Sequence, residues 1–322
     1  MSRKVIIDTD PGIDDTIAIL LALSAPEELE ILALTSVNGN VGIEKTTRNC
    51  FQILHAGGRM DIPVYRGSSR PLMRARDNCE QFHGDDGLGN LDLPDVPVTP
   101  QDEDAVSFLL RITRQMPGEI TLVTLGPLTN IARALQEDPA FAGRVKELII
   151  MGGAEHGGNM SPHAEFNFWT DPEAAKIVMA AGFSPVTMIG LDATSHIILT
   201  PALRELLYLI NTPTSRLIHR MTRGYADAHW AIKKRLGCEL CDVLTIGYLL
   251  DESVAQTVDA YVDVETQGLC DGASVVYRSK YYPEMQKNCR VAVSADPVRF
   301  FRLFFGHLFP DYADIAEEIL RS

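Results

Sequence analysis

The chain alternates short apolar runs with longer stretches in which apolar residues recur at helical spacing. The runs at 4–7, 29–37, 120–125, 147–151 and 185–189 predict buried strands, since each is short and is followed by a turn or a helix-start signal. Helical patterns separate these strands, so the chain repeats a strand–helix unit. This rhythm predicts an α/β fold with an open, mostly parallel, doubly wound sheet and helices on both faces.

The second half of the chain keeps this plan with variations. Residues 201–250 are predicted to be mainly helical, 257–278 to form a hairpin, and 290–293 to form a last strand before C-terminal helices. Residues 67–100 are rich in Gly, Pro, Asp and Asn, and an irregular segment of this length is more often functional than idle. We find no linker or repeat, so we expect residues 1–322 to form a single domain.

Composition narrows the functional class. The chain has 322 residues, of which 46% are hydrophobic and 22% charged, with a formal net charge of −14. Such an acidic protein is a poor candidate for nucleic-acid binding. We see no signal peptide, and the apolar helix at 16–23 is too short to span a membrane. Six scattered cysteines do not make a disulfide scaffold, so we expect a cytoplasmic protein.

Four aspartates follow the first predicted strand within eight residues: Asp8, Asp10, Asp14 and Asp15. A strand-to-helix turn in such a fold lies at the carboxyl end of the sheet, where ligands bind. Carboxylates crowded into one turn repel each other. A hard divalent cation with oxygen ligands is the simplest compensation.

Three alternative roles for this turn account for fewer of its aspartates. Helix capping would explain Asp14 and Asp15 only. An EF-hand loop fails because Gly12 and Ile19 occupy its fifth and twelfth positions. A phosphatase of the haloacid dehalogenase type also begins with strand-Asp-x-Asp. It would make Asp8 the nucleophile and Asp10 the acid, and it leaves Asp14 and Asp15 without a role.

Polar residues also follow later predicted strands. They are Asn40, Asn159, Glu165 and Asn167. Amide groups both donate and accept hydrogen bonds, so this set suits a polyhydroxylated ligand, although a single Asn in a loop is usually a turn residue.

Cys238 and Cys241 form a C-x-x-C motif beside Asp242. A redox role would place the motif at the first strand–helix junction, and a zinc site would need a second pair, so neither is favoured. Asp242 is either a helix N-cap or a group that returns to the aspartate turn.

Some ring-bearing residues could belong to a site. His83, in the glycine-rich segment, is either a surface residue or a catalytic group on a mobile flap. An apolar pocket or the core could hold the remaining candidates, which are Phe166, Trp169, Tyr225, His229 and Trp230.

Taken in order, these motifs resemble the inosine–uridine-preferring nucleoside hydrolases. The resemblance rests on Asp8-Thr9-Asp10-Pro11-Gly12-Ile13-Asp14-Asp15, Gly39-Asn40, Glu44 to Asn49, His83-Gly84 with Gly87-Leu88, Gly126 to Asn130, Glu165-Phe166-Asn167 and Asp171 to Ala174. It extends from about residue 4 to residue 275.

The resemblance implies a Ca²⁺-dependent enzyme that hydrolyses the N-glycosidic bond of ribonucleosides. It implies Ca²⁺ ligation by Asp10, Asp15, Asp242 and the carbonyl of Leu125, with Asp10 also the general base towards water. The ribose hydroxyls would be held by Asp14, Asn40, Asn159, Glu165 and Asn167, with His83 near the nucleobase. The partner would be a small ribonucleoside, and family members are commonly homodimers or homotetramers.

The chain departs from the best-known family pattern at Cys241, where many members have a His as the presumed acid for the leaving nucleobase. A thiol is a weak hydrogen-bond donor. The proton source is therefore open between Cys241, His83, Tyr225, His229 and water. Two other functions also remain open: hydrolysis of a different ribosylated base, and a catalytically weak homologue that only binds Ca²⁺ and ribose.

Overall fold

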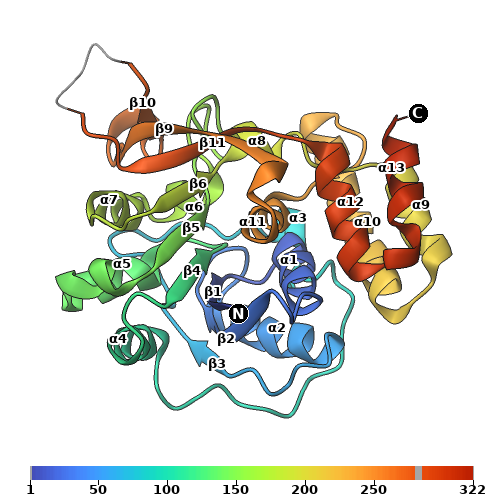
Figure 1. The fold of residues 1–322 in the computed structure, drawn as a ribbon, viewed down its shortest axis with the longest axis horizontal. Coiled ribbons are helices and arrows are strands. Elements are labelled where there is room, and N and C mark those ends of the chain that lie inside the picture. The colour runs from blue at the N-terminus through green and yellow to red at the C-terminus, as the bar shows by residue number, and fades with distance from the viewer. Residues whose placement is uncertain (1, 280–284, 322) are drawn as a thin grey trace.

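A nine-stranded sheet runs through the computed structural model, which describes residues 2–279 and 285–321 (Figure 1). The strands are β1 (Arg3–Thr9), β2 (Leu29–Ser36), β3 (Val64–Arg66), β4 (Ile120–Thr124), β5 (Glu147–Met151), β6 (Val186–Ile189), β7 (Ile198–Leu199), β8 (Cys238–Glu239), β9 (Ala255–Val264), β10 (Ser274–Tyr277) and β11 (Cys289–Ala295). The large sheet has the order β10-β9-β11-β6-β5-β4-β1-β2-β3, and β7 pairs with β8 separately.

The helices connect these strands and pack on both faces of the sheet. They are α1 (Ile13–Leu23), α2 (Ile43–Ala56), α3 (Glu80–His83), α4 (Ala105–Gln115), α5 (Thr129–Glu137), α6 (Phe166–Thr170), α7 (Pro172–Ala180), α8 (Leu191–Thr194), α9 (Pro201–Ile210), α10 (Pro213–Lys233), α11 (Cys241–Leu250), α12 (Pro297–Leu308) and α13 (Ala313–Arg321). Among the described residues, no helix is both long and apolar enough to cross a membrane.

The sheet reverses its direction of growth at β1. The chain proceeds from β1 outward to β2 and β3, then returns to β4 on the other side of β1 and continues to β5 and β6, all in parallel pairings. Such a reversal opens a crevice at the carboxyl ends of the two central strands. The aspartates after β1 and Leu125 after β4 therefore lie at the place where doubly wound folds bind ligands.

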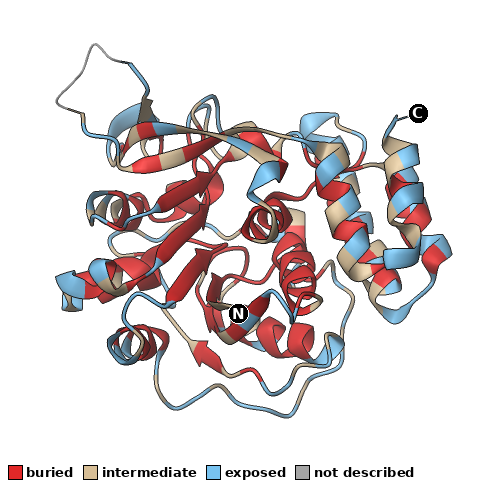
Figure 2. Cartoon of the chain, in the orientation of Figure 1, coloured by how far each residue is buried: buried red, intermediate tan, exposed pale blue. Residues whose placement is uncertain are grey.

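Two apolar layers enclose the sheet. One cluster joins the sheet to α1, α2 and the helices from α9 to α12, and the other joins it to α4, α5 and α7. Figure 2 shows the resulting buried sheet between helices whose outer faces are exposed. The predicted α/β class, with a mostly parallel sheet and helices on both faces, is confirmed.

Most predicted elements are confirmed within a few residues, including the hairpin, which is the antiparallel pair β9–β10. One predicted boundary was wrong. The first helix begins at Ile13 rather than at residue 16, because the Asp15 side chain accepts the Gly12 N–H and so caps an earlier turn. The prediction that residues 201–250 are mainly helical is confirmed by α9, α10 and α11, and the short strand β8 (Cys238–Glu239) within this region pairs with β7.

Phe304 tests the apolar layer formed by the C-terminal helices. It is fully buried in α12, so we expect Phe304→Ala to lower the free energy of unfolding by about 3–5 kcal/mol, measured by chemical denaturation. Arg302 lies in the same helix with an exposed ion pair, so Arg302→Ala is the control and should cost less than about 1 kcal/mol. Equal losses in the two variants would contradict this assignment of the core.

Candidate active site

Asp8 supports the site from inside the sheet. Its Oδ2 accepts hydrogen bonds from Thr35 Oγ1 at 2.5 Å and from Asn130 Nδ2 at 2.7 Å, which tie β1 to β2 and to α5. Complete burial raises the pKa of Asp8 to about 7. Asp8 therefore organises the strand ends and is absent from the pocket lining.

Asp10 is buried at the end of β1 with one oxygen unpartnered. Its Oδ2 accepts the Asn40 N–H at 2.7 Å, whereas its Oδ1 has no hydrogen-bond partner. A Cβ at Gly39 would lie 2.0 Å from Asp10 Oδ2, and one at Gly126 would lie 2.3 Å from Oδ1, so only glycine fits beside this carboxylate. A buried carboxylate oxygen without a donor is the group that a metal ion would satisfy.

Asp14, Asp15 and Asp242 form a buried acidic triad. Each offers one oxygen, and the three oxygens lie within 4.8 Å of one another. Asp15 is held by Thr9 Oγ1 at 2.6 Å, by the Gly12 N–H at 2.9 Å and by Asn40 Nδ2 at 3.0 Å. Asp242 lies in the first turn of α11, whose N-cap is Leu240, so it is not an N-cap, and it does return to the aspartate turn.

These carboxylates repel each other in a dry environment. Burial, with Asp15 the leading neighbouring charge, raises the pKa of Asp14 to about 7 and that of Asp10 well above its ordinary value. Burial and the charges of Asp14 and Asp15 also raise the pKa of Asp242. Among the described residues, no Lys or Arg forms an ion pair with any of these groups, and the His83 Nδ1 that lies 4.0 Å from Asp14 accepts the Ile13 N–H and carries no charge. The donor set therefore fits a divalent cation, which supplies the missing positive charge.

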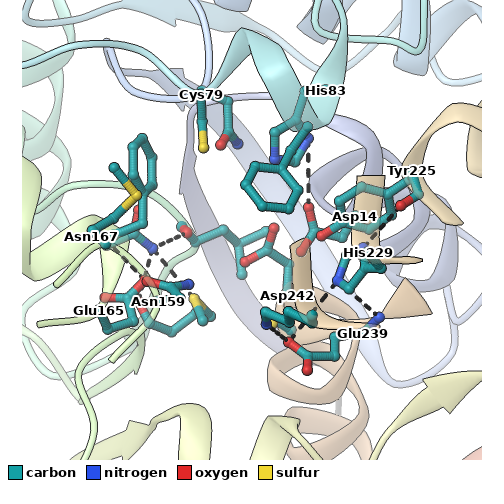
Figure 3. A pocket seen from close by; sticks show the side chains of 18 residues that line it. Asp14, Cys79, His83, Asn159, Glu165, Asn167, Tyr225, His229, Glu239 and Asp242 are labelled. Atoms are coloured by element: carbon teal, nitrogen blue, oxygen red, sulfur yellow. Dashed lines mark hydrogen bonds and ion pairs between the residues drawn. The ribbon is translucent and has the colours of Figure 1, made fainter. Parts of the chain in front are cut away.

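Glu165 and Asn167 form the opposite side of the pocket (Figure 3). Glu165 caps α6 and accepts the N–H groups of Gly153 and Asn167, both at 2.9 Å, and burial raises its pKa to about 7. Asn167 Nδ2 donates to the Leu125 carbonyl at 2.7 Å, which leaves the Asn167 Oδ1 to accept from a ligand. Asn159 and Asn40 line the same pocket, with Asn159 exposed on a loop.

His83 is buried on the short helix α3 rather than exposed in a loop. Its Nδ1 accepts the Ile13 N–H at 3.0 Å, so the neutral ring carries its proton on Nε2. Burial lowers the pKa of His83 to about 3. His83 is thus a neutral hydrogen-bond donor at the edge of the pocket.

Tyr225 and His229 extend this side of the pocket from α10. Their rings meet edge to face with centroids 4.5 Å apart, and the His83 ring lies 5.3 Å from that of Tyr225. The His229 Nδ1 faces the Tyr225 carbonyl at 2.9 Å, and its Nε2 accepts the Glu239 N–H at 3.4 Å. Flat ligand groups fit between such rings.

The structure divides the remaining candidates. Cys241 lines the pocket, and burial raises the pKa of its thiol, so it stays protonated. Phe166 also lines the pocket, whereas Trp169 and Trp230 are absent from the lining. Trp169 instead lies under the Arg76 guanidinium, 4.6 Å from its carbon, and Trp230 is 51% exposed on α10.

Sequence reasoning missed several lining residues: Cys79, Phe82, Met151, Met160, Lys233 and Glu239. Glu239 lies inside the C-x-x-C motif and pairs with Lys233 and Arg235 on either side of the turn after α10. The available signal in the sequence was an acidic residue, Glu239, that follows the basic residues Lys233 and Arg235 by six and four positions.

Together these groups line one pocket at the reversal point of the sheet. The lining presents carboxylates and amides together with aromatic and imidazole rings, and Asp14 lies beside Tyr225 and His229 in Figure 3. This arrangement defines an α/β enzyme that uses an acidic, metal-binding centre on a ligand with a polyhydroxylated part and a flat part.

Comparison with known proteins names the family. The sequence profile of the family described as "Inosine-uridine preferring nucleoside hydrolase" matches residues 5–302. The chain therefore belongs to this family, whose members are metal-dependent N-ribohydrolases that cleave N-glycosyl bonds.

Relatives extend along nearly the whole chain. It is 40% identical over 314 residues to the inosine-uridine preferring nucleoside hydrolase of Leishmania major, covering 96% of this chain and 98% of that protein. It is 37% identical over 312 residues to the pyrimidine-specific ribonucleoside hydrolase RihA of Shigella boydii, covering 96% and 99%. The solved structure of the plant nucleoside hydrolase PpNRh1 is 34% identical, with a TM-score of 0.91 and coverage of 96% and 99%.

The acidic triad predicts how stability depends on pH without metal. The native pKa of Asp14, about 7, exceeds its ordinary 3.8, so between these values the folded state binds more protons than the unfolded state. Stability contributed by this group is present at about pH 4 and is lost as the pH rises through about 7. We expect the melting temperature of chelator-treated protein to fall across this window, and Ca²⁺ at about pH 7.5 to restore it.

Asp14→Asn removes one titrating group, so its melting temperature should fall less over the same window than that of the wild type. The exposed Asp227 provides the control, because Asp227→Asn should keep the wild-type dependence. Identical pH dependence in all three proteins would show that the buried carboxylate does not titrate as described.

Proposed function

We propose that this protein is a Ca²⁺-dependent ribonucleoside hydrolase that releases free nucleobase and ribose from uridine- or inosine-like substrates. The observation that carries the proposal is the buried acidic cluster beneath the pocket, with an unpartnered Asp10 oxygen and no Lys or Arg ion-paired to the cluster among the described residues. Hard oxygen donors in this number favour Ca²⁺ over softer metals. Asp10, Asp15, Asp242 and the Leu125 carbonyl would hold the ion.

The mechanism follows from the charges around the pocket. Breaking an N-glycosidic bond gives C1′ oxocarbenium character, and the neighbouring carboxylates stabilise that positive charge. Bound Ca²⁺ would orient the ribose diol and lower the pKa of a water molecule. Asp10 accepts the proton that the attacking water loses, through the carboxylate oxygen that has no hydrogen-bond partner in the structure.

The remaining residues divide between ribose and nucleobase. Asp14, Asn40, Asn159, Glu165 and Asn167 would bind the ribose hydroxyls, an assignment supported by their common place in the pocket lining. His83 would donate its Nε2–H to the nucleobase. Tyr225 and His229 would bound the nucleobase from α10, and Cys241 lies within the same lining.

Base preference does not transfer from the relatives, because one is named inosine-uridine preferring and another pyrimidine-specific. The six free cysteines support our expectation of a reducing, cytoplasmic environment. The homodimer or homotetramer expected from the family resemblance also remains a proposal.

Asp10→Asn tests the two roles proposed for Asp10, general base and Ca²⁺ ligand. The change keeps the shape of the side chain and removes its basicity, so we expect ribose release to fall by about 10²–10⁴-fold. Release is measured as reducing sugar from uridine, cytidine, inosine and adenosine, with and without a chelator. Asp227→Asn is the surface control. Near-normal turnover in Asp10→Asn would remove Asp10 from these roles, and metal binding without any turnover of wild type would favour a binding protein.

His83 and Cys241 compete for the role of hydrogen-bond donor to the nucleobase. The His83 tautomer is set by the Ile13 N–H, whereas a thiol donates weakly, so we expect a loss of about a hundredfold for His83→Ala and less than about fivefold for Cys241→Ser. Both are read as kcat/KM for uridine. A thousandfold loss in Cys241→Ser would instead identify the thiol as the donor.

A further inference from the structure

Lys233 is the cationic side chain in the pocket lining of the described residues. It ends α10, its side chain is 28% exposed, and its Nζ hydrogen-bonds Glu239 Oε2. Glu239 is buried and lies 4.0 Å from His229 Nε2, on the ring-bearing side of the pocket. Lys233 is therefore at the opposite end of the pocket from Glu165 and Asn167 (Figure 3 labels Glu239 and His229 there).

The pairing of Glu239 leaves one positive charge in excess. Arg235 binds the other oxygen of Glu239 through NH1 and also donates to the Ser195 carbonyl at 3.2 Å. Arg235 does not line the pocket, and it balances the Glu239 charge from behind. Lys233 and Arg235 together exceed the charge of Glu239 by one, and of these two cations Lys233 is the one in the pocket lining.

The neighbouring groups cannot easily protonate a departing nucleobase. His83 and His229 each have one ring nitrogen that accepts a backbone N–H, from Ile13 and Glu239 respectively, so each ring carries a single proton. Giving up that proton would leave an imidazolate, and the Cys241 thiol is a weak donor. His83 can donate its Nε2–H, whereas the single proton of His229 lies on Nδ1 and is donated to the Tyr225 carbonyl. The negative charge of the leaving group therefore still needs a counter-charge.

We propose that Lys233 is a catalytic residue of the hydrolysis: its ammonium stabilises the negative charge that develops on the nucleobase as it departs. The inference rests on the proposed function and adds to it a residue and a substrate class, nucleosides whose base leaves as an anion. The C1′–N bond breaks with its electron pair on the base nitrogen, and water adds to C1′. The proton that the water loses passes to Asp10, and the base anion takes up a proton from solvent.

The test compares two leaving groups of different charge. Uridine loses its base as an anion, whereas nicotinamide riboside, an N-ribosylpyridinium, loses a neutral base. In Lys233→Met, kcat/KM for uridine should fall by about ten- to a hundredfold, less than the loss of a fully buried donor, because the ammonium is partly solvated. The same variant should lose no rate on nicotinamide riboside, since no anion forms there.

Two matched variants separate charge from structure. Lys233→Arg keeps the charge and should stay within about threefold of wild type on uridine. Arg235→Met removes the other cation that pairs with Glu239. It should lower the melting temperature, but it should not lower kcat/KM for uridine selectively over kcat/KM for nicotinamide riboside. If nicotinamide riboside is not hydrolysed, we instead compare its inhibition constant for uridine hydrolysis between wild type and Lys233→Met. Lys233→Met should then bind it more tightly, because a repulsion is removed.

The outcomes distinguish the two proposals. An absence of ribose release from every nucleoside by wild-type protein overturns the proposed function, and this inference with it. Activity of wild type with an unchanged Lys233→Met overturns the inference alone. Two further results would overturn the inference: an equal loss of kcat/KM on uridine and on nicotinamide riboside, or, where nicotinamide riboside is only an inhibitor, an unchanged inhibition constant in Lys233→Met. Either result would show that Lys233 acts only as a structural partner of Glu239.

Discussion

The burial of like charges is the constraint on which this structure depends. Asp10, Asp14, Asp15 and Asp242 lie beneath one pocket, and each is at most 5% exposed. Their mutual repulsion and loss of hydration oppose folding. The fold offsets this cost in three ways: it supplies N–H donors from the start of α1 and from Asn40, it leaves space with glycines at 39 and 126, and it buries apolar layers on both faces of the sheet.

The same constraint explains the polarity of the pocket. Carboxylates line the pocket in which a sugar carbon would become positive, and Lys233, in the same lining, is the group that we propose stabilises the negative charge of the leaving group. A heterolytic cleavage separates charge in that direction, so the fixed charges complement the transition state more than the neutral substrate.

Local sequence patterns predicted the features that depend on residues close together along the chain. The strands, the reversal-point location of the aspartates and the polar residues after β2 and β5 follow from periodicity and from the geometry of parallel sheets. Long-range pairing could not be predicted in this way. The grouping of Asp14, Asp15 and Asp242 into one triad depends on the approach of α11 to α1. The exposure of Trp230 depends on how α10 is rotated about its axis. The Lys233–Glu239 pair forms only because β8 turns back beside the end of α10.

The first turn of α1 connects the two ends of the chemistry. A helix start leaves N–H groups without partners inside the helix. Here the Gly12 N–H binds Asp15, within the acidic triad, and the Ile13 N–H binds His83 Nδ1, which fixes the proton of that ring on Nε2. One backbone turn therefore holds a carboxylate of the acidic triad and fixes the tautomer of His83, the donor that we propose binds the leaving nucleobase. Because a Cβ at Gly12 would lie 2.4 Å from His83 Nδ1, glycine at this position is what allows both contacts at once.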